Sequence, residues 1–219
     1  GLVHAELERM ILEGQLPAGS KLTEAALAGQ LGVSRGPLRE AFRMLEEAGL
    51  VRTEKNRGVF VRELPIDEVL EIFEVRAALD EFVGRTLATR ASASQHRELR
   101  RLAQATERAA AAQDASAFHL FNLQLHDRLL ELAGNAKLSA TYRKLTKELA
   151  LARRQNLSAE SMLIYAAEHR KIVEAIASGD AEAAGAAMRE HALNSRARTL
   201  QNHQQRLAAG GDGADGAAV

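Results

Sequence analysis

The sequence predicts a mainly α-helical protein in two parts: three short helices with a small β-hairpin, then an antiparallel all-helical bundle. The 219 residues include no Trp, two Tyr and 46% hydrophobic residues, with much Ala, Leu, Glu and Arg, which favours helix over sheet. The residue pattern of the chain changes near Leu64. Two of the three prolines lie before this position, and almost continuous helical periodicity follows it. We therefore assign residues 1–64 and 65–207 to two domains, and expect the polar, Gly-rich residues 208–219 to be a disordered tail.

Three helices are predicted in the first domain. The first spans residues 2–12, and the segment GQLPAGS ends it. The second, TEAALAGQL, begins at Thr23 as the expected N-cap and ends at Gly32. The third, SRGPLREAFRMLEEAG, begins at Ser34 as its N-cap and ends at Gly49.

The third helix carries a buried stripe formed by Leu38, Phe42 and Leu45. After it come LVRTE and GVFVRE, two runs whose alternation suits strands, joined by a turn at residues 55–58. Three helices and a hairpin in this order form a winged helix-turn-helix.

Six helices are predicted in the second domain, separated by AGN at 133–135, by the region 156–158 and by SGD at 178–180. Short connections between helices favour an antiparallel bundle. The predicted ranges are 66–90, 95–112, 115–133, 136–156, 159–178 and 180–207.

Basic charge is concentrated in the first domain, although the formal net charge of the chain is zero. Residues 34–62 carry seven Arg or Lys against four Glu. Arg is well suited to a guanine edge in the major groove, and free N–H groups at a helix start can receive a phosphate. The arginines alone would fit a solvated helix face, but the helix order, the capped start and the basic hairpin together favour DNA binding. The predicted contacts are Ser34, Arg35, Gly36, Arg39, Arg43, Lys55 and Arg57.

The stretch LPAGSKLTEAALAGQLGVSRGPLREAFRMLEEAGLV, with the later RGVFV, resembles the N-terminal domain of GntR-type bacterial transcription regulators. The resemblance implies that Ser34, Arg35, Gly36 and Arg39 are the main readers of DNA, with Gly58 in the wing. The chain departs from the family pattern in two places: PAG replaces the usual PG, and Ala25 stands where some members carry a DNA-contacting Arg.

Two histidines of the second domain are predicted to meet. His169 lies 10 residues before Gly179, and His191 lies 11 residues after Asp180. At about 1.5 Å rise per residue, both stand roughly 15 Å from the turn, so antiparallel helices bring them level. Each shares a face with apolar residues, and both are therefore expected to point into the bundle.

A third histidine, His126, also shares an apolar face, and Asn122 lies one turn before it. Three imidazoles and one amide oxygen suit a divalent metal, with zinc or nickel favoured. His119, seven residues before His126, could compete as a ligand. The alternative is that these histidines are ordinary hydrogen-bonded core residues.

The second domain resembles the FCD ligand-binding domain of FadR-subfamily GntR regulators, through NLQLH, GN, EHRKIVEAIASGD and MREH. Six helices resemble its VanR-like branch. The resemblance implies a metal site formed by Asn122, His126, His169 and His191. Asp is usual where Asn122 stands, so we expect weaker metal binding.

FCD domains typically bind small organic acids, and an anion inside a bundle needs an Arg partner. Arg76 and Arg198 are the candidates, and the Tyr165 hydroxyl could add a hydrogen bond. A salt bridge or a core hydroxyl is the competing explanation for each of them.

Together these features predict a ligand-responsive transcription regulator, usually a repressor in this family. We expect a cytoplasmic homodimer that binds a palindromic operator in double-stranded DNA, and no membrane association, because no apolar run reaches transmembrane length. A metalloenzyme with a three-histidine site is the rival class. Glu168, Asp127 and Glu190 each adjoin a ligand in sequence and should point to a different face, which argues against catalysis. A purely structural bundle is a third possibility.

Overall fold

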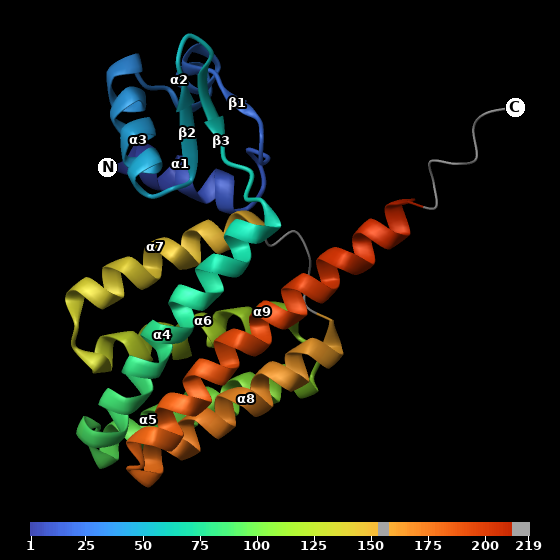
Figure 1. Cartoon of the computed structure of the whole chain (residues 1–219). Helices are drawn as coiled ribbons and strands as arrows, with labels where there is room; N and C mark the ends of the chain where they lie inside the picture. Colours follow the sequence, from blue (N-terminus) through green and yellow to red (C-terminus); the bar gives the residue numbers. More distant parts are fainter. Residues whose placement is uncertain (153–157, 212–219) are drawn as a thin grey trace, which may run out of the picture. The chain divides into compact units, whose positions relative to one another are not determined.

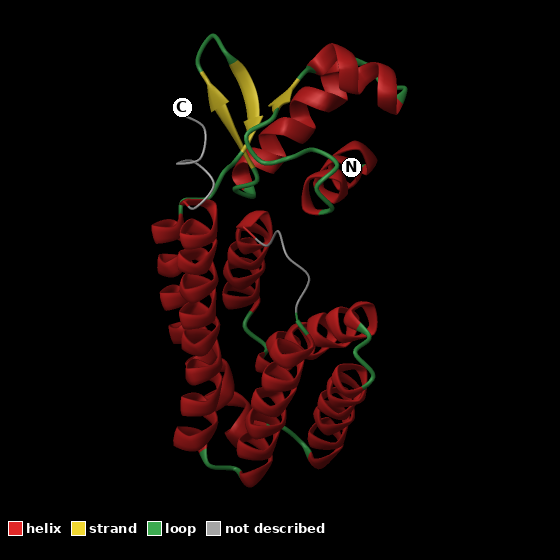
Figure 2. Ribbon diagram, turned by 90° about the vertical axis from the view of Figure 1, so that its right-hand side faces the viewer, coloured by secondary structure: helices red, strands yellow, loops and turns green. Residues whose placement is uncertain are grey.

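The computed structural model describes residues 1–152 and 158–211. Over this part of the chain the fold is mainly helical, with one small sheet near the N-terminus (Figures 1 and 2). The chain divides into two compact units within helices α4 (Ile66–Arg90) and α7 (Ala136–Ala152). The first unit holds Gly1–Val69 and the part of α7 from Thr141 onward, and the second holds Leu70–Ala140 and the helices after α7.

Three helices form the start of the first unit, as predicted: α1 (Leu2–Leu12), α2 (Glu24–Leu31) and α3 (Arg35–Glu47). Gly32 ends α2 with a positive φ of 65°, a conformation that glycine adopts without steric cost. The α3 helix ends at Glu47 with Ala48 as its C-cap, and Gly49 follows in the left-handed region.

The predicted side-chain caps of two helices are absent. Thr23 and Ser34 stand at the N-cap positions of α2 and α3 with extended backbone, but neither side chain makes a capping hydrogen bond within the described residues. The Ser34 hydroxyl is therefore not committed to its own helix start.

The sheet has three strands rather than the two predicted. Strands β2 (Val51–Glu54) and β3 (Gly58–Val61) form the hairpin, and β1 (Lys21–Leu22) pairs antiparallel with the other edge of β3. A two-residue strand is too short to show alternation, so the sequence pattern could not reveal β1.

The core of the first unit joins all of these elements. Leu38 and Leu45 of the predicted α3 stripe are fully buried, together with Leu7 of α1. Leu22 and Val61 bring the sheet to the same core. The part of α7 in this unit contributes Leu151 to that core, while Lys147 pairs with Glu8 of α1 at 2.7 Å.

Six helices follow the sheet in the described chain, and most predicted bounds hold to within two residues. The α9 helix continues past the predicted end at residue 207, so residues 208–211 are helical rather than part of a disordered tail. The predicted end of α7 at residue 156 and the remaining tail, 212–219, lie outside the described residues. The helices not yet given are α5 (Ala93–Ala111), α6 (Ala115–Ala133), α8 (Ala159–Ser178) and α9 (Ala181–Gly211).

The hairpin between α8 and α9 has the predicted turn. Gly179 ends α8 with a φ of 78°, and the Asp180 carboxylate accepts a hydrogen bond from the Ala183 backbone N–H at 3.0 Å. The two helices then pack along each other, which sets His169 and His191 on facing surfaces.

In the second unit α5 packs against α6 and α8, and α8 packs against α9. Figure 1 shows α8 and α9 (orange and red) lying alongside each other. The α4 helix meets α9 at Gly84, where an added Cβ would clash with the backbone carbonyl of Ala184 and lie 2.9 Å from Met188 Cγ. None of the helices in the described chain combines the length and apolarity needed to cross a bilayer.

Candidate metal centre and nucleic-acid interface

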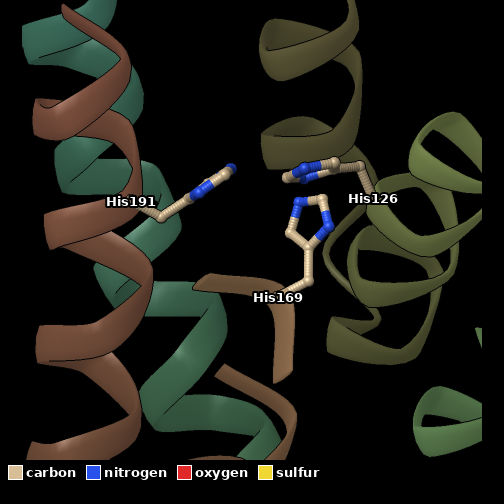
Figure 3. Close-up of side chains that lie close together, drawn as sticks. All are labelled: His126, His169 and His191. Carbon is tan, nitrogen blue, oxygen red and sulfur yellow. The ribbon is translucent and has the colours of Figure 1, made fainter. Parts of the chain in front are cut away.

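Three histidines from three helices converge in the second unit. His126 of α6, His169 of α8 and His191 of α9 turn their rings toward one another (Figure 3). The ring centroids are 5.2 Å apart for His126 and His169, 5.3 Å for His126 and His191, and 5.0 Å for His169 and His191. One nitrogen of each ring lies within 4.8 Å of the other two. The predicted levelling of His169 and His191 is therefore confirmed, and His126 joins them.

His169 is the most enclosed of the three. Its side chain is fully buried, and neither ring nitrogen has a hydrogen-bond partner among the described residues. Burial and the neighbouring His191 lower the pKa of His169 well below the usual value of 6.5, so the ring is neutral. A buried polar atom without a partner is costly, and a neutral imidazole nitrogen is a metal ligand.

The donor set fits a divalent metal such as zinc or nickel, because borderline cations bind neutral imidazole nitrogen well. The predicted fourth ligand, Asn122, lies on α6 one turn before His126 and is half-buried, and its part in the site stays a prediction. His119, the possible competitor, is exposed on the same helix.

The carboxylate of Glu168 contacts the ring of His191. Glu168 Oε2 is 2.7 Å from Nδ1 of His191, across the interface between α8 and α9. We expected Glu168 to point to a different face of α8 from the adjacent His169, but not that this face would bring it to another histidine of the cluster. Consecutive residues do diverge on one helix, but α9 occupies the side of α8 to which Glu168 turns.

Glu168 accepts hydrogen bonds from two further residues of α9. Arg198 donates to both carboxylate oxygens, at 2.8 and 3.0 Å, and Asn194 Nδ2 donates at 3.0 Å. Partial burial raises the pKa of Glu168, but the hydrogen bonds from His191 and Arg198 outweigh it and lower that pKa to about 2. The carboxylate is thus ionised at neutral pH.

Two of the three predicted effector contacts lie beside this network. The Arg198 guanidinium stacks over the Tyr165 ring at 4.2 Å from its centroid, and that ring lies 5.9 Å from the His191 ring. Both terminal nitrogens of Arg198 are engaged by Glu168, so an effector carboxylate at Arg198 would have to share or displace that partner.

The third predicted effector contact, Arg76, lies on α4. It is only 6% exposed, and its guanidinium is 3.7 Å from the carboxylate of Asp80, one turn further along the helix. Burial of Arg76 is consistent with an interior role, and contact with an effector stays a prediction.

The sequence reasoning missed Glu168 and Asn194 as partners of the site. Helical periodicity places residues on the faces of their own helix, but it does not tell which neighbouring helix a face meets. The pairing of α8 with α9 in an antiparallel hairpin was the one available signal.

The exposed face of α3 carries the predicted arginines of the first unit. Arg35, Arg39 and Arg43 are all exposed and lie on the side away from the core. Arg39 pairs with Glu24 of α2 at 3.0 Å, and Arg43 pairs with Glu40 at 2.6 Å. DNA binding would replace these surface pairs at little cost, since exposed ion pairs contribute at most about 1 kcal/mol.

The start of α3 leaves room for DNA to approach its backbone closely. A Cβ added at the exposed Gly36 would meet nothing within 4 Å. In the turn between β2 and β3, Lys55 and Arg57 are exposed, and Gly58 has a φ of 111° that favours glycine.

Lys21 is a further cation near the wing that the sequence reasoning did not single out. Register places Lys21 opposite Phe60, and Lys21 Nζ and Arg57 Cζ lie 6.0 and 5.6 Å from the Phe60 ring centroid. The pairing of β1 with β3 creates this neighbourhood, so a missed strand explains a missed residue.

Comparison with known proteins decides the family. The pattern of the family described as "Bacterial regulatory proteins, gntR family" matches residues 2–61, and that of the FCD domain matches residues 71–195. A protein of Paenarthrobacter nicotinovorans, assigned as a transcriptional repressor of a D-xylose utilization operon, is 34% identical over 83% of this chain and 80% of its own length. The chain belongs to the GntR family.

Other relatives and solved structures also support membership of the GntR family. The Nta operon transcriptional regulator of Aminobacter aminovorans is 32% identical over 62% of this regulator and 64% of its own length. A GntR-type regulator from Rhodococcus sp. RHA1 has a TM-score of 0.71 at 27% identity, covering 91% of this chain and 96% of that one. McbR/YncC of E. coli has a TM-score of 0.75 at 19% identity, covering 92% and 97%, and so shows the shared fold.

This GntR-family regulator is thus a DNA-binding transcription regulator, and not an enzyme. Its winged helix matches the gntR pattern, and its histidine cluster falls within the FCD match.

Proposed function

We propose that this regulator senses a small organic acid through a zinc or nickel ion in its FCD domain and releases operator DNA in response. The observation that carries the proposal is the histidine cluster. Three imidazoles from three helices each offer a nitrogen within 4.8 Å of the other two, and both nitrogens of the buried His169 lack partners among the described residues. A core histidine without a ligand would instead be expected to form a hydrogen bond.

His126, His169 and His191 would hold the ion, with Asn122 adding an amide oxygen. When bound, the ion supplies a Lewis-acidic position for a carboxylate or hydroxyl oxygen of the effector. Arg76, Arg198 and Tyr165 are the proposed partners of the remaining effector atoms. Their cationic and hydroxyl groups suit an anion.

In the proposed DNA complex, two copies of the chain place two α3 helices on a palindromic operator. Repression fits relatives named as repressors of D-xylose and gluconate operons. Gluconate carries a carboxylate, the group that the proposed metal position would take. Release of DNA requires that the effector bind the two states of the regulator with different affinity.

The first test is metal content. Protein purified without chelator is analysed for metal beside His169→Ala and the matched control His119→Ala, which removes an exposed histidine of α6. We expect about one ion per chain in the wild type and the control, and none in His169→Ala. A wild type free of metal that also fails to bind added zinc or nickel would show that the histidines are inert core residues.

The second test is effector binding. A thermal-shift screen of small organic acids, with and without zinc or nickel, should reveal acids that stabilise only the metal-bound protein. Such an acid should also weaken operator binding in a gel-shift assay. Stabilisation that does not depend on metal would argue for effector binding away from the histidines.

A further inference from the structure

Glu168 connects the histidine cluster to one face of α9. Its three partners, His191, Asn194 and Arg198, lie at i, i+3 and i+7 along that helix, which places them on one side. A single carboxylate of α8 is therefore held by three donors that a neighbouring helix presents together.

We propose that Glu168 is a positioning residue for the metal centre: it fixes the ring tautomer and orientation of His191, and Arg198 in turn fixes Glu168. The inference rests on the proposed metal function. It gives Arg198 a role in orienting a metal ligand, in addition to its proposed contact with the effector.

The tautomer follows from hydrogen-bond chemistry. Both oxygens of the Glu168 carboxylate accept hydrogen bonds from Arg198, and a carboxylate held in this way only accepts, so the 2.7 Å contact requires Nδ1 of His191 to carry the proton. A neutral imidazole protonated at Nδ1 leaves the lone pair on Nε2. Figure 3 shows the far end of the His191 ring directed at His126 and His169, where that lone pair would meet a metal.

The orientation of Glu168 follows from its other donors. The two parallel bonds from Arg198 set the plane of the carboxylate, because the guanidinium fork is rigid. Arg198 itself is fixed by stacking on Tyr165 and by a 3.2 Å hydrogen bond to Ser195 Oγ. Outer partners of this kind raise the basicity of a ligating histidine and hold its ring in place.

A simple ion pair between Glu168 and Arg198 would not require Glu168 to contact His191 as well. Such a pair could form on the exposed side of α9, whereas Glu168 also reaches the 5% exposed His191. The contact between Glu168 and a ring that lies against the other two histidines links the pair to the cluster.

The decisive measurement is the tautomer of His191 in the wild-type protein. Two-bond ¹H–¹⁵N spectra of histidine-labelled protein, with His191 assigned by loss of its signals in His191→Gln, separate the two tautomers. We expect the Nδ1–H form in metal-free protein, and a zinc-dependent shift confined to Nε2. A His191 that carries its proton on Nε2 overturns the inference without any change in Glu168.

Metal affinity of variants supplies the second measurement. By competition with a chromophoric chelator, Glu168→Ala should bind zinc about 10- to 100-fold more weakly than wild type. Glu168→Gln, which keeps an acceptor oxygen, should recover part of that loss, and Arg198→Lys should lose affinity less than Glu168→Ala. The control Glu174→Gln changes an exposed carboxylate of the same helix and should bind zinc as the wild type does.

The outcomes separate this inference from the proposed function. A wild type that binds no zinc contradicts the metal function itself, before any variant is made. A wild type that binds zinc, with folded Glu168→Ala of equal affinity, overturns the positioning role alone. If Glu168→Ala does not fold, Arg198→Lys and the wild-type tautomer still decide the question.

Discussion

At the scale of single residues, two side chains that are assigned to binding lie in opposite environments, one buried and one exposed. His169 is buried with unpaired nitrogens, while Arg35 is exposed on the face of α3 and, within the described part of the chain, has no carboxylate partner in an ion pair. The first arrangement is costly, because a buried polar atom without a partner loses its hydrogen bonds to water, whereas the exposed Arg35 stays hydrated and is available to a partner. The proposed metal would give the nitrogens of His169 a partner, and DNA would give Arg35 one.

Arg35→Ala should abolish specific operator binding and leave the fold unchanged. A bidentate contact between arginine and guanine contributes about 1–3 kcal/mol of discrimination, which corresponds to roughly a 5- to 150-fold loss of affinity. A gel-shift assay with operator and unrelated DNA measures it. Arg97→Ala, an exposed arginine of α5, is the control, and unchanged binding by Arg35→Ala would contradict the assignment of α3.

Arg57→Ala should behave differently, because a wing residue that contacts phosphate carries no sequence information. We expect weaker binding to operator and unrelated DNA alike, and a salt dependence of log K whose slope falls by about 1. Titrations at several salt concentrations measure the slope. A loss restricted to operator DNA would instead place Arg57 against a base edge.

At the scale of elements, close helix packing and hairpin geometry position the histidines. The α4 and α9 helices approach closely at Gly84, and the turn at Gly179 sets the pairing of α8 with α9. The Ser92 side chain and Gln95 form a reciprocal cap at the start of α5, which packs against both α6 and α8. Side chains on α6, α8 and α9 can share a point because these contacts fix the helices relative to one another.

Gly84→Ala should destabilise the bundle by about 1–3 kcal/mol, because the new methyl group would meet the backbone carbonyl of Ala184 and the helices would have to separate. Gly185→Ala is the matched comparison. Its Cβ would meet the side chain of Arg85, which can move, so a smaller loss is expected. Urea unfolding measures both, and equal effects would show that the approach of α4 to α9 is not tight.

At the scale of the whole molecule, the concentrated basic charge and the histidine cluster lie in different units. The formal net charge is zero, yet residues 34–62 gather seven basic residues against four acidic ones, within the first unit. The histidine cluster lies in the second unit and joins three of its helices. A metal at that point would cross-link helices that are distant in the sequence.

Removal of metal should therefore lower the melting temperature of the second unit. A ligand present at about 100 times its Kd stabilises by about 2.7 kcal/mol, which is roughly 5–11 °C for a chain of this size. Differential scanning calorimetry with chelator, and after zinc is restored, measures the change. His169→Ala should show no response to chelator, and a response as large as that of the wild type would mean that the metal binds elsewhere.

The sequence by itself determined the helices and the β-hairpin of this protein within the described residues, but not strand β1. Apolar spacing predicted the buried face of α3, Gly32 and Gly179 marked helix ends, and equal distances from one turn placed His169 level with His191. These features depend on period, rise per residue and local backbone conformation, which the order of residues controls directly.

Only the tertiary structure decided which side chains meet between elements. It paired Lys21 with Phe60 through a strand too short to predict. It also set α9 against the face of α8 that carries Glu168, so that Glu168 meets His191 and Arg198. The reason is physical. Periodicity gives the direction of a side chain relative to its own axis, whereas its partner depends on which neighbouring helix or strand packing places in that direction.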